Sequence, residues 1–244
     1  MKTNYVVKAS ANPQALDLYM YDDIQGNSLN WFTGKTEVSE TSDDFVRKAL
    51  AAAKNISQIN IFINSYGGSV MEGVAIVNLL KRHSAKKTVY VDGFACSIAS
   101  VIAMVGDKVI MASNAVMMIH HAWMVVAGNP KDLRKAADDL QVIDDVSNVS
   151  YLEKAGAKLT PEKLTELLDA ETWLSATQCI EYGLADEITG QEPASITTAK
   201  ARVKQAIQDE VNQKLNAVTV PKKLAKNKTN AEKLMEAFKK KQER

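Results

Sequence analysis

The sequence predicts an α/β fold made of β-α-β units, with a parallel sheet that helices cover on both faces. Apolar runs of strand length alternate along the chain with segments of helical spacing. Some of these runs, such as residues 115–119, are apolar throughout, which is typical of buried parallel strands. The chain of 244 residues, 46% of them hydrophobic, is long enough for one large core with an appendage.

The first half of the chain divides into strands and helices by its periodicity and its turn residues. Residues 15–21 alternate well enough for a strand, and turn residues follow at 25–28. The sequence Thr-Ser-Asp-Asp at 41–44 begins a capped helix, which leads to a strand at 59–64. The next expected elements are a helix at 70–80, a strand at 87–92 that stops at Gly93, a helix at 97–105, and strands at 109–111 and 115–120.

The second half of the chain begins with a long helix. Residues 131–155 carry an apolar stripe from Leu133 to Leu152 with acidic residues between its members. Such a stripe fits either packing on its own domain or an interface with another molecule. Shorter helices are expected at 161–168 and 177–182, and residues 184–188 close a domain that spans residues 1–190.

Residues 191–244 form a basic C-terminal extension with a different composition. Segment 197–244 has a net charge of +8, whereas residues 1–196 have a net charge of −7. Residues 197–219 are loosely spaced for an amphipathic helix. Beyond Pro221 the apolar residues are too few to offset a backbone ordering cost of roughly 1–2 kcal/mol per residue, so we expect this part to be disordered.

Ser97 is a candidate nucleophile because it lies where an expected strand turns into a helix. A hydroxyl at such a corner projects from the backbone, and the free N–H groups at the helix start can hold an oxyanion. The alternative is a small-residue turn that only lets a helix pack closely on a sheet. Cys96 is a second candidate nucleophile, although its apolar setting, like that of Cys179, fits a small buried thiol.

Features on both sides of Ser97 fit acyl transfer, which needs a base for the hydroxyl and donors for the oxyanion. Upstream, Gly67 and Gly68 follow a strand and offer N–H groups at a turn into a helix. Downstream, His120 and His121 follow another strand. Both histidines are therefore candidates for the base.

Three motifs occur in the order and spacing of the Clp-type (ClpP-like) serine peptidases. They are Asn64-Ser65-Tyr66-Gly67-Gly68, Gly93-Phe94-Ala95-Cys96-Ser97 and Met118-Ile119-His120. The chain resembles this family over roughly residues 16–189 and, more narrowly, the ClpP-related head-maturation proteases of tailed phages and prophages. The resemblance implies a crotonase-like (ClpP) spiral of β-α-β units, with a projecting handle helix at about 131–155 that mates two stacked rings.

The resemblance also implies the roles of single residues. Ser97 would attack the scissile carbonyl, and His120 would take its proton and later give it to the leaving amine. The N–H groups of Gly68 and Ile98 would form the oxyanion hole. His121 would then have no catalytic role.

The triad acid follows from a family motif in which an aromatic-Leu-Ser-Ala step comes just after it. Matching residues 173–176 to that step places Glu171 at the position of the acid, where housekeeping members carry aspartate. Asp169 is the alternative acid, because two carboxylates two residues apart would share a face in an extended segment.

Other chemistries fit the sequence poorly, and we expect neither a metal nor a cofactor. Neighbouring His120 and His121 would point to opposite faces of a strand and could not share one ion. No phosphate-binding glycine loop is followed by Lys-Ser/Thr, so ATP hydrolysis would belong to a partner. The basic extension has a single aromatic residue, Phe238, which disfavours nucleic-acid binding. No apolar run reaches the roughly 18 residues of a membrane span, and residues 1–4 open no signal-peptide pattern, so we expect a cytoplasmic protein.

The sequence therefore predicts a self-compartmentalising serine endopeptidase that acts in Clp-type proteolysis or prophage head maturation. Expected partners are protein and peptide substrates, further copies of the chain in a heptameric ring or two stacked rings, an AAA+ unfoldase, and capsid proteins. Two alternatives remain. One is a catalytically silent capsid-assembly or scaffolding protein. The other is a crotonase-type acyl-CoA enzyme, in which Ser97 and His120 would have no catalytic role.

Overall fold

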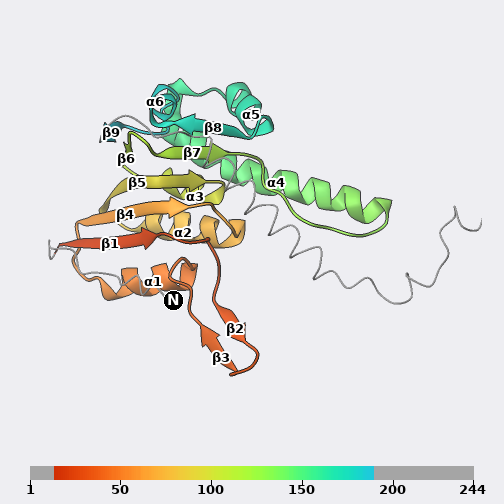
Figure 1. Cartoon of the computed structure of the whole chain (residues 1–244), viewed down its shortest axis with the longest axis horizontal. Coiled ribbons are helices and arrows are strands. Elements are labelled where there is room, and N and C mark those ends of the chain that lie inside the picture. The colour runs from red at the N-terminus through yellow and green to blue at the C-terminus, as the bar shows by residue number, and fades with distance from the viewer. Residues whose placement is uncertain (1–13, 190–244) are drawn as a thin grey trace, which may run out of the picture. The chain divides into compact units, whose positions relative to one another are not determined.

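A computed structural model of the chain describes residues 14–189, which form a mostly parallel sheet flanked by helices (Figure 1). The strands are β1 (Ala15–Met20), β2 (Ser28–Asn30), β3 (Lys35–Glu37), β4 (Gln58–Ser65), β5 (Lys86–Cys96), β6 (Lys108–Ala112), β7 (Val116–Ile119), β8 (Thr172–Ser175) and β9 (Glu187–Thr189). The helices are α1 (Asp43–Ala52), α2 (Val70–Arg82), α3 (Ile98–Ala103), α4 (Pro130–Ala155), α5 (Pro161–Asp169) and α6 (Ala176–Glu181), with a 3-10 turn at Gly156–Lys158. The expected extension at 191–244 lies outside the described residues.

The main sheet follows the expected β-α-β pattern. Strands β1, β4, β5, β6 and β9 lie side by side in this order, and all of these pairs are parallel. The end of β5 also pairs in parallel with β7, and β7 pairs in antiparallel fashion with β8. The α/β class is therefore confirmed, while β8 and the short β2–β3 hairpin were not expected from the periodicity.

Strand β5 does not stop at Gly93, and the expected boundary is wrong. The strand continues to Cys96, and its last three residues exchange β6 for β7 as a neighbour. The register between β4 and β5 shifts at this point. A Cβ atom at position 93 would lie 2.4 Å from Oδ1 of Asn64, which accepts the N–H of Phe94 at 3.1 Å. Glycine therefore lets the strand pass Asn64 while it changes partner.

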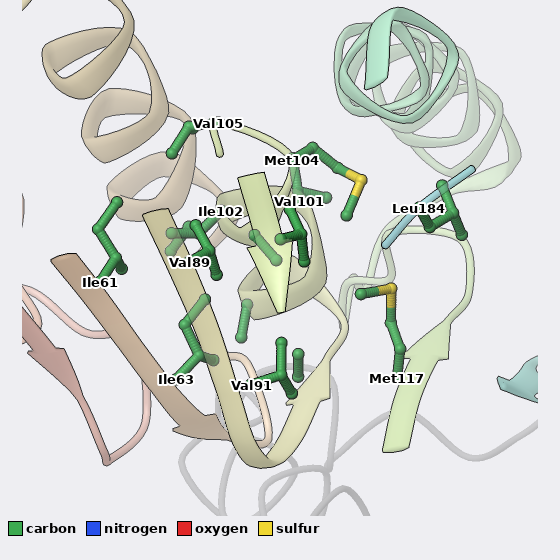
Figure 2. Packing of buried hydrophobic residues seen from close by; sticks show 14 of the residues in the cluster. Ile61, Ile63, Val89, Val91, Val101, Ile102, Met104, Val105, Met117 and Leu184 are labelled. Carbon is green, nitrogen blue, oxygen red and sulfur yellow. The ribbon is translucent and has the colours of Figure 1, made fainter. Parts of the chain in front are cut away.

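The hydrophobic core lies on one face of the sheet. Alternate residues of β4, Ile59, Ile61 and Ile63, are fully buried, and they join the apolar residues of α2 and α3 in one cluster. Figure 2 shows side chains of β4 and β5 packed with those of α3, together with Met117 and Leu184.

The opposite face of the sheet is only half buried within residues 14–189, so the described part of the chain does not confirm helical cover on both faces. Here the rings of Tyr19 and Tyr90 stack on either side of Phe62, with centroids 4.7 and 4.9 Å from it. The three rings come from adjacent strands at equivalent positions in the register. They form a ladder of cross-strand contacts that stabilises the sheet.

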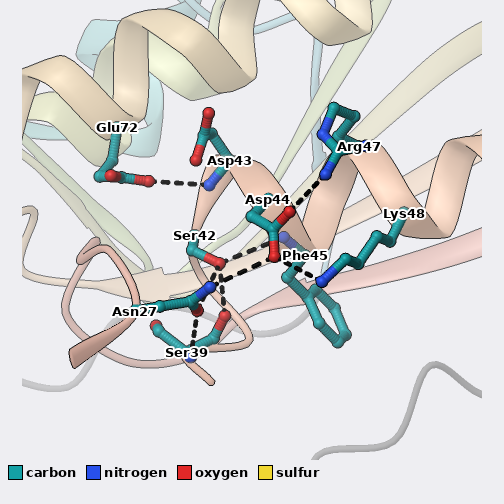
Figure 3. A network of polar contacts seen from close by, with 9 residues as sticks. All are labelled: Asn27, Ser39, Ser42, Asp43, Asp44, Phe45, Arg47, Lys48 and Glu72. Carbon is teal, nitrogen blue, oxygen red and sulfur yellow. Dashed lines mark hydrogen bonds and ion pairs between the residues drawn. The ribbon is translucent and has the colours of Figure 1, made fainter. Parts of the chain in front are cut away.

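A polar network holds the start of α1 beside the start of α2 (Figure 3). The Ser42 hydroxyl accepts the N–H of Phe45 at 3.1 Å, so the predicted cap is confirmed. The carboxylate of Glu72, in the first turn of α2, accepts the N–H of Asp43 at 2.8 Å. Each bond satisfies an N–H group that a helix start leaves without an internal partner.

Helix α4 is only partly packed on its own chain. It spans the expected residues and extends beyond the ends of the strands in Figure 1. Its buried residues, Asp144, Ser150, Tyr151 and Ala155, all lie in its second half. Part of the apolar stripe is exposed, including Val146 and Val149, and Val142 beside the stripe retains 63% of its accessible surface. Within residues 14–189, no helix has both the length and the apolar character that crossing a membrane would require.

Candidate active site

Ser97 lies at a strained corner between β5 and α3. Its φ and ψ angles are 53° and −131°, a backbone conformation that costs a residue other than glycine about 1–3 kcal/mol. The Ser97 N–H donates to the carbonyl oxygen of Met118 on β7 at 2.8 Å. The surrounding elements therefore hold the serine in a conformation that it would not adopt alone.

His120 is the histidine that reaches Ser97. It follows directly after β7, and its Nε2 lies 2.7 Å from the Ser97 hydroxyl oxygen. Burial lowers the pKa of His120 below its usual 6.5, and the charges of Glu171 and Asp144 oppose this effect only in part. The imidazole is therefore neutral at neutral pH and can accept a proton. The local pattern alone left the choice between the two adjacent histidines open, and the family resemblance indicated His120.

Glu171 lies opposite His120 in the β7–β8 ladder. The register pairs Ile119 with Thr172, so the next position beyond the strand ends sets His120 against Glu171. Glu171 has a φ of 46°, and its carboxylate raises the pKa of His120 through charge. The side chain is exposed, and no hydrogen bond joins it to His120 in the described structure.

Asp169 has a different partner. It is the last residue of α5, so the two carboxylates do not share the extended segment that the sequence analysis assumed. Its Oδ1 lies 3.0 Å from Nε2 of His121. The alternative acid is therefore bonded to the histidine that does not reach Ser97.

The turn between β4 and α2 touches the Ser97 corner through glycine. A Cβ atom on Gly67 would lie 2.7 Å from the Cβ of Ser97, and one on Gly68 would lie 2.3 Å from the carbonyl oxygen of Ile24. Ile24 holds the turn by donating to the Gly67 carbonyl and accepting from the N–H of Ser69, both at 2.7 Å. The close approach requires the absence of side chains.

The N–H groups of Gly68 and Ile98, the two that the sequence analysis assigned to an oxyanion hole, are not used in backbone hydrogen bonds within the described residues. Ile98 is the first residue of α3, so its N–H has no acceptor inside the helix. Neither this N–H nor that of Gly68 has an acceptor within residues 14–189. Ile98 follows Ser97 directly, and Gly68 follows Gly67, where a Cβ atom would lie 3.3 Å from the Ile98 nitrogen.

A pocket opens beside Ser97 and His120. Its lining residues are Val70, Ser97, Ile98, Val101, His120, Ala122, Asp144, Ser147, Asn148 and Tyr151. Apolar side chains of α2 and α3 form one part of the wall, and polar side chains of α4 form another.

Cys96 is not a suitable nucleophile. Its side chain is fully buried, and this burial raises the pKa of the thiol to about 12. The thiolate is the reactive form of cysteine, and it is scarce at neutral pH under these conditions. Burial likewise raises the pKa of Cys179 to about 12. The sequence interpretation of both residues as small buried thiols agrees with their positions.

His121 bridges α4 and α5, a role that the sequence analysis missed. Its Nδ1 lies 2.8 Å from Oδ2 of the buried Asp144 on α4, while its Nε2 faces Asp169. Asp144 also accepts the N–H of Ala122 at 2.6 Å. Within residues 14–189, no three acidic, histidine or cysteine side chains are grouped as metal ligands. No local sequence pattern predicts this bridge, because its three members are far apart in the sequence.

The bridge predicts a pH-dependent contribution to stability. Burial of His121 acts to lower its pKa, but the hydrogen bonds to Asp169 and Asp144 outweigh it, so the pKa is raised above 6.5. Because the folded state holds the proton more tightly, the stabilisation is complete below pH 6.5 and disappears as pH rises through the folded pKa. His121→Gln should therefore reduce the free energy of unfolding more at about pH 6 than at about pH 8.5, measured by urea denaturation. An equal loss at both pH values would refute the bridge.

Comparisons with known proteins agree with this geometry. A family model described as Clp protease matches residues 31–192. The ATP-dependent Clp protease proteolytic subunit of Streptococcus pneumoniae (strain 70585) is 32% identical over 174 residues, which cover 69% of this chain and 88% of that protein. The ATP-dependent Clp protease proteolytic subunit 1 of Prochlorococcus marinus (strain MIT 9312) is 27% identical over 169 residues, covering 68% and 86% of the two chains. The chain belongs to the Clp protease family.

Proposed function

We propose that this protein is a serine endopeptidase in which Ser97 and His120 carry out the chemistry. The observation that carries the proposal is the 2.7 Å contact between His120 Nε2 and Ser97 Oγ at the strained start of α3. Membership in the Clp protease family supports peptide-bond hydrolysis as the reaction.

In the proposed mechanism, neutral His120 takes the Ser97 proton as the hydroxyl oxygen attacks the scissile carbonyl. The resulting oxyanion is bound by the N–H groups of Gly68 and Ile98. His120 then donates the proton to the leaving amine, which leaves an acyl group on Ser97. Water, deprotonated by the same histidine, releases the acyl group and restores the enzyme.

Glu171 is proposed as the acid that orients His120. Its place opposite His120 in the β7–β8 ladder and its effect on the histidine pKa support this role. The exposed carboxylate would have to turn onto the free ring nitrogen when substrate or a neighbouring subunit excludes water from the site. Asp169 is the weaker candidate, because it is bonded to His121.

We further propose that the active sites are enclosed in an oligomeric ring. The exposed side of α4, with Val142, Val146 and Val149 on its surface, supports an interface with other copies. A heptameric ring, alone or as two stacked rings, follows the family resemblance. The names of the relatives include ATP dependence, so an AAA+ unfoldase is a proposed partner. Action in the cytoplasm and a role in capsid maturation, with capsid proteins as substrates, are the narrower form of the proposal.

The first functional prediction concerns the nucleophile and the base. A fluorophosphonate probe should label Ser97 in the intact protein, and Ser97→Ala and His120→Ala should abolish cleavage of a short fluorogenic peptide. His121→Ala should retain most of the activity, because His121 faces two carboxylates instead of Ser97. This adjacent variant is the matched control.

Each other outcome points to a different function. Absence of labelling and of cleavage in a folded, assembled protein would favour a silent scaffolding role. Hydration of an enoyl thioester that survives in Ser97→Ala would favour a crotonase-type enzyme. Loss of activity in His121→Ala together with activity in His120→Ala would contradict the proposed base.

The second prediction concerns the acid and the pH profile. The acid limb of kcat/KM should lie below pH 6.5, because burial lowers the pKa of His120. Glu171→Gln should reduce kcat by roughly 10²- to 10⁴-fold and move the limb to lower pH, since a charge that raises this pKa is lost. Asp169→Asn is the control and should keep both kcat and the pH of the acid limb near their wild-type values. The reverse pattern would assign the acid to Asp169.

The third prediction concerns assembly. Val142→Lys places a charge on the exposed side of α4 and should reduce the particle mass measured by light scattering. Val38→Lys is the matched control, because this valine is 59% exposed and lies away from α4. A wild-type protein that is a fully active monomer would contradict the ring, and unchanged mass in Val142→Lys would contradict the interface on α4.

A further inference from the structure

The carbonyl group of Ser97 is held by two hydrogen bonds from one residue. The N–H of Ser100 donates to it at 2.9 Å, and the hydroxyl of Ser100 donates to it at 2.5 Å. Ser100 is fully buried in α3, so water does not compete for these bonds. A carbonyl bound twice in this way has little freedom to rotate.

The Ser100 hydroxyl is itself fixed by Tyr151 of α4. The two hydroxyl oxygens lie 2.6 Å apart, and the exposed fraction of Tyr151 is 2%. A serine hydroxyl has one proton, which here points at the Ser97 carbonyl, so Tyr151 must be the donor in this second bond. Burial also raises the pKa of Tyr151, which keeps its proton in place. The result is a directed chain from Tyr151 through Ser100 to Ser97.

This chain determines the direction of the Ile98 N–H. The peptide group between Ser97 and Ile98 is planar, and in its trans form the carbonyl and the N–H point in opposite directions. Fixing the Ser97 carbonyl toward Ser100 therefore fixes the Ile98 N–H on the opposite side of the peptide plane. That N–H has no acceptor inside the helix that it begins.

We infer that Ser100 and Tyr151 are positioning residues that orient the Ile98 N–H toward the oxyanion formed on Ser97. The inference rests on the proposed peptidase function and deepens it. Both hydroxyls belong to buried residues and are hydrogen-bonded within the protein. Their effect passes through one peptide plane, and it makes the packed half of α4 part of the catalytic geometry.

The test uses the full-length protein and a short fluorogenic peptide. Loss of a whole oxyanion donor costs about 10²- to 10³-fold in kcat, so loss of its orientation in Tyr151→Phe or Ser100→Ala should cost about tenfold, with KM nearly unchanged. The double variant should be no slower than Ser100→Ala, because Tyr151 acts only through that hydroxyl. Tyr90→Phe is the matched control and should keep the wild-type kcat, since Tyr90 lies in the aromatic ladder on the other face of the sheet.

A second measurement separates orientation from general loosening. A peptide aldehyde forms a hemiacetal with Ser97, and its oxygen occupies the oxyanion position. In Tyr151→Phe and Ser100→Ala the affinity of the protein for the peptide aldehyde should fall by the same factor as kcat/KM. The affinity of the unreactive peptide alcohol of the same sequence should stay unchanged. If Tyr151→Phe does not fold, Ser100→Ala carries the test by itself.

The outcomes distinguish this inference from the function on which it rests. A wild-type protein that neither cleaves the peptide nor binds the aldehyde covalently would overturn both. A wild-type protein that does both, with variants that match it in kcat and in aldehyde affinity, would overturn the positioning role alone. Equal losses for the aldehyde and the alcohol would also overturn it, because they would indicate damage to peptide binding in general.

Discussion

The site depends on a close approach of two backbones at which no side chain can be accommodated. Gly67 lies so near Ser97 that a Cβ atom would come within 2.7 Å of the serine Cβ. On the other side, the Ser97 N–H donates a hydrogen bond to the carbonyl oxygen of Met118 on β7. Packed between these neighbours, Ser97 keeps a left-handed φ that costs about 1–3 kcal/mol. Burial of all six residues of α3 offsets this cost. The Ser97 hydroxyl oxygen held in this way lies 2.7 Å from Nε2 of His120.

Helix α4 has buried residues that contact the site and an exposed side that faces away from the core. Its buried residues contact the site at two points, where Asp144 binds His121 and where Tyr151 binds Ser100. Its exposed side, which carries Val142, Val146 and Val149, is the proposed contact with further copies of the chain.

Local patterns predicted much of the fold and of the candidate site. The cap at Ser42, the long helix α4 and the position of Ser97 between strand and helix all follow from residues that are neighbours in the sequence. The choice of His120 came from a family motif, since the two adjacent histidines have the same local pattern. Periodicity could not predict the contacts that join segments distant in the sequence. Strand β5 continues past Gly93 because β7 offers it a new partner, and His121 is fixed by carboxylates from two helices.

A crystal structure of the protein with a peptide boronate tests the central claim most directly. The proposed mechanism predicts a bond from boron to Ser97 Oγ, with one boronate hydroxyl between the N–H groups of Gly68 and Ile98. His120 Nε2 should bond the other hydroxyl. A boronate bound elsewhere, or one bound to Ser97 whose oxygens face away from both N–H groups, would contradict the account.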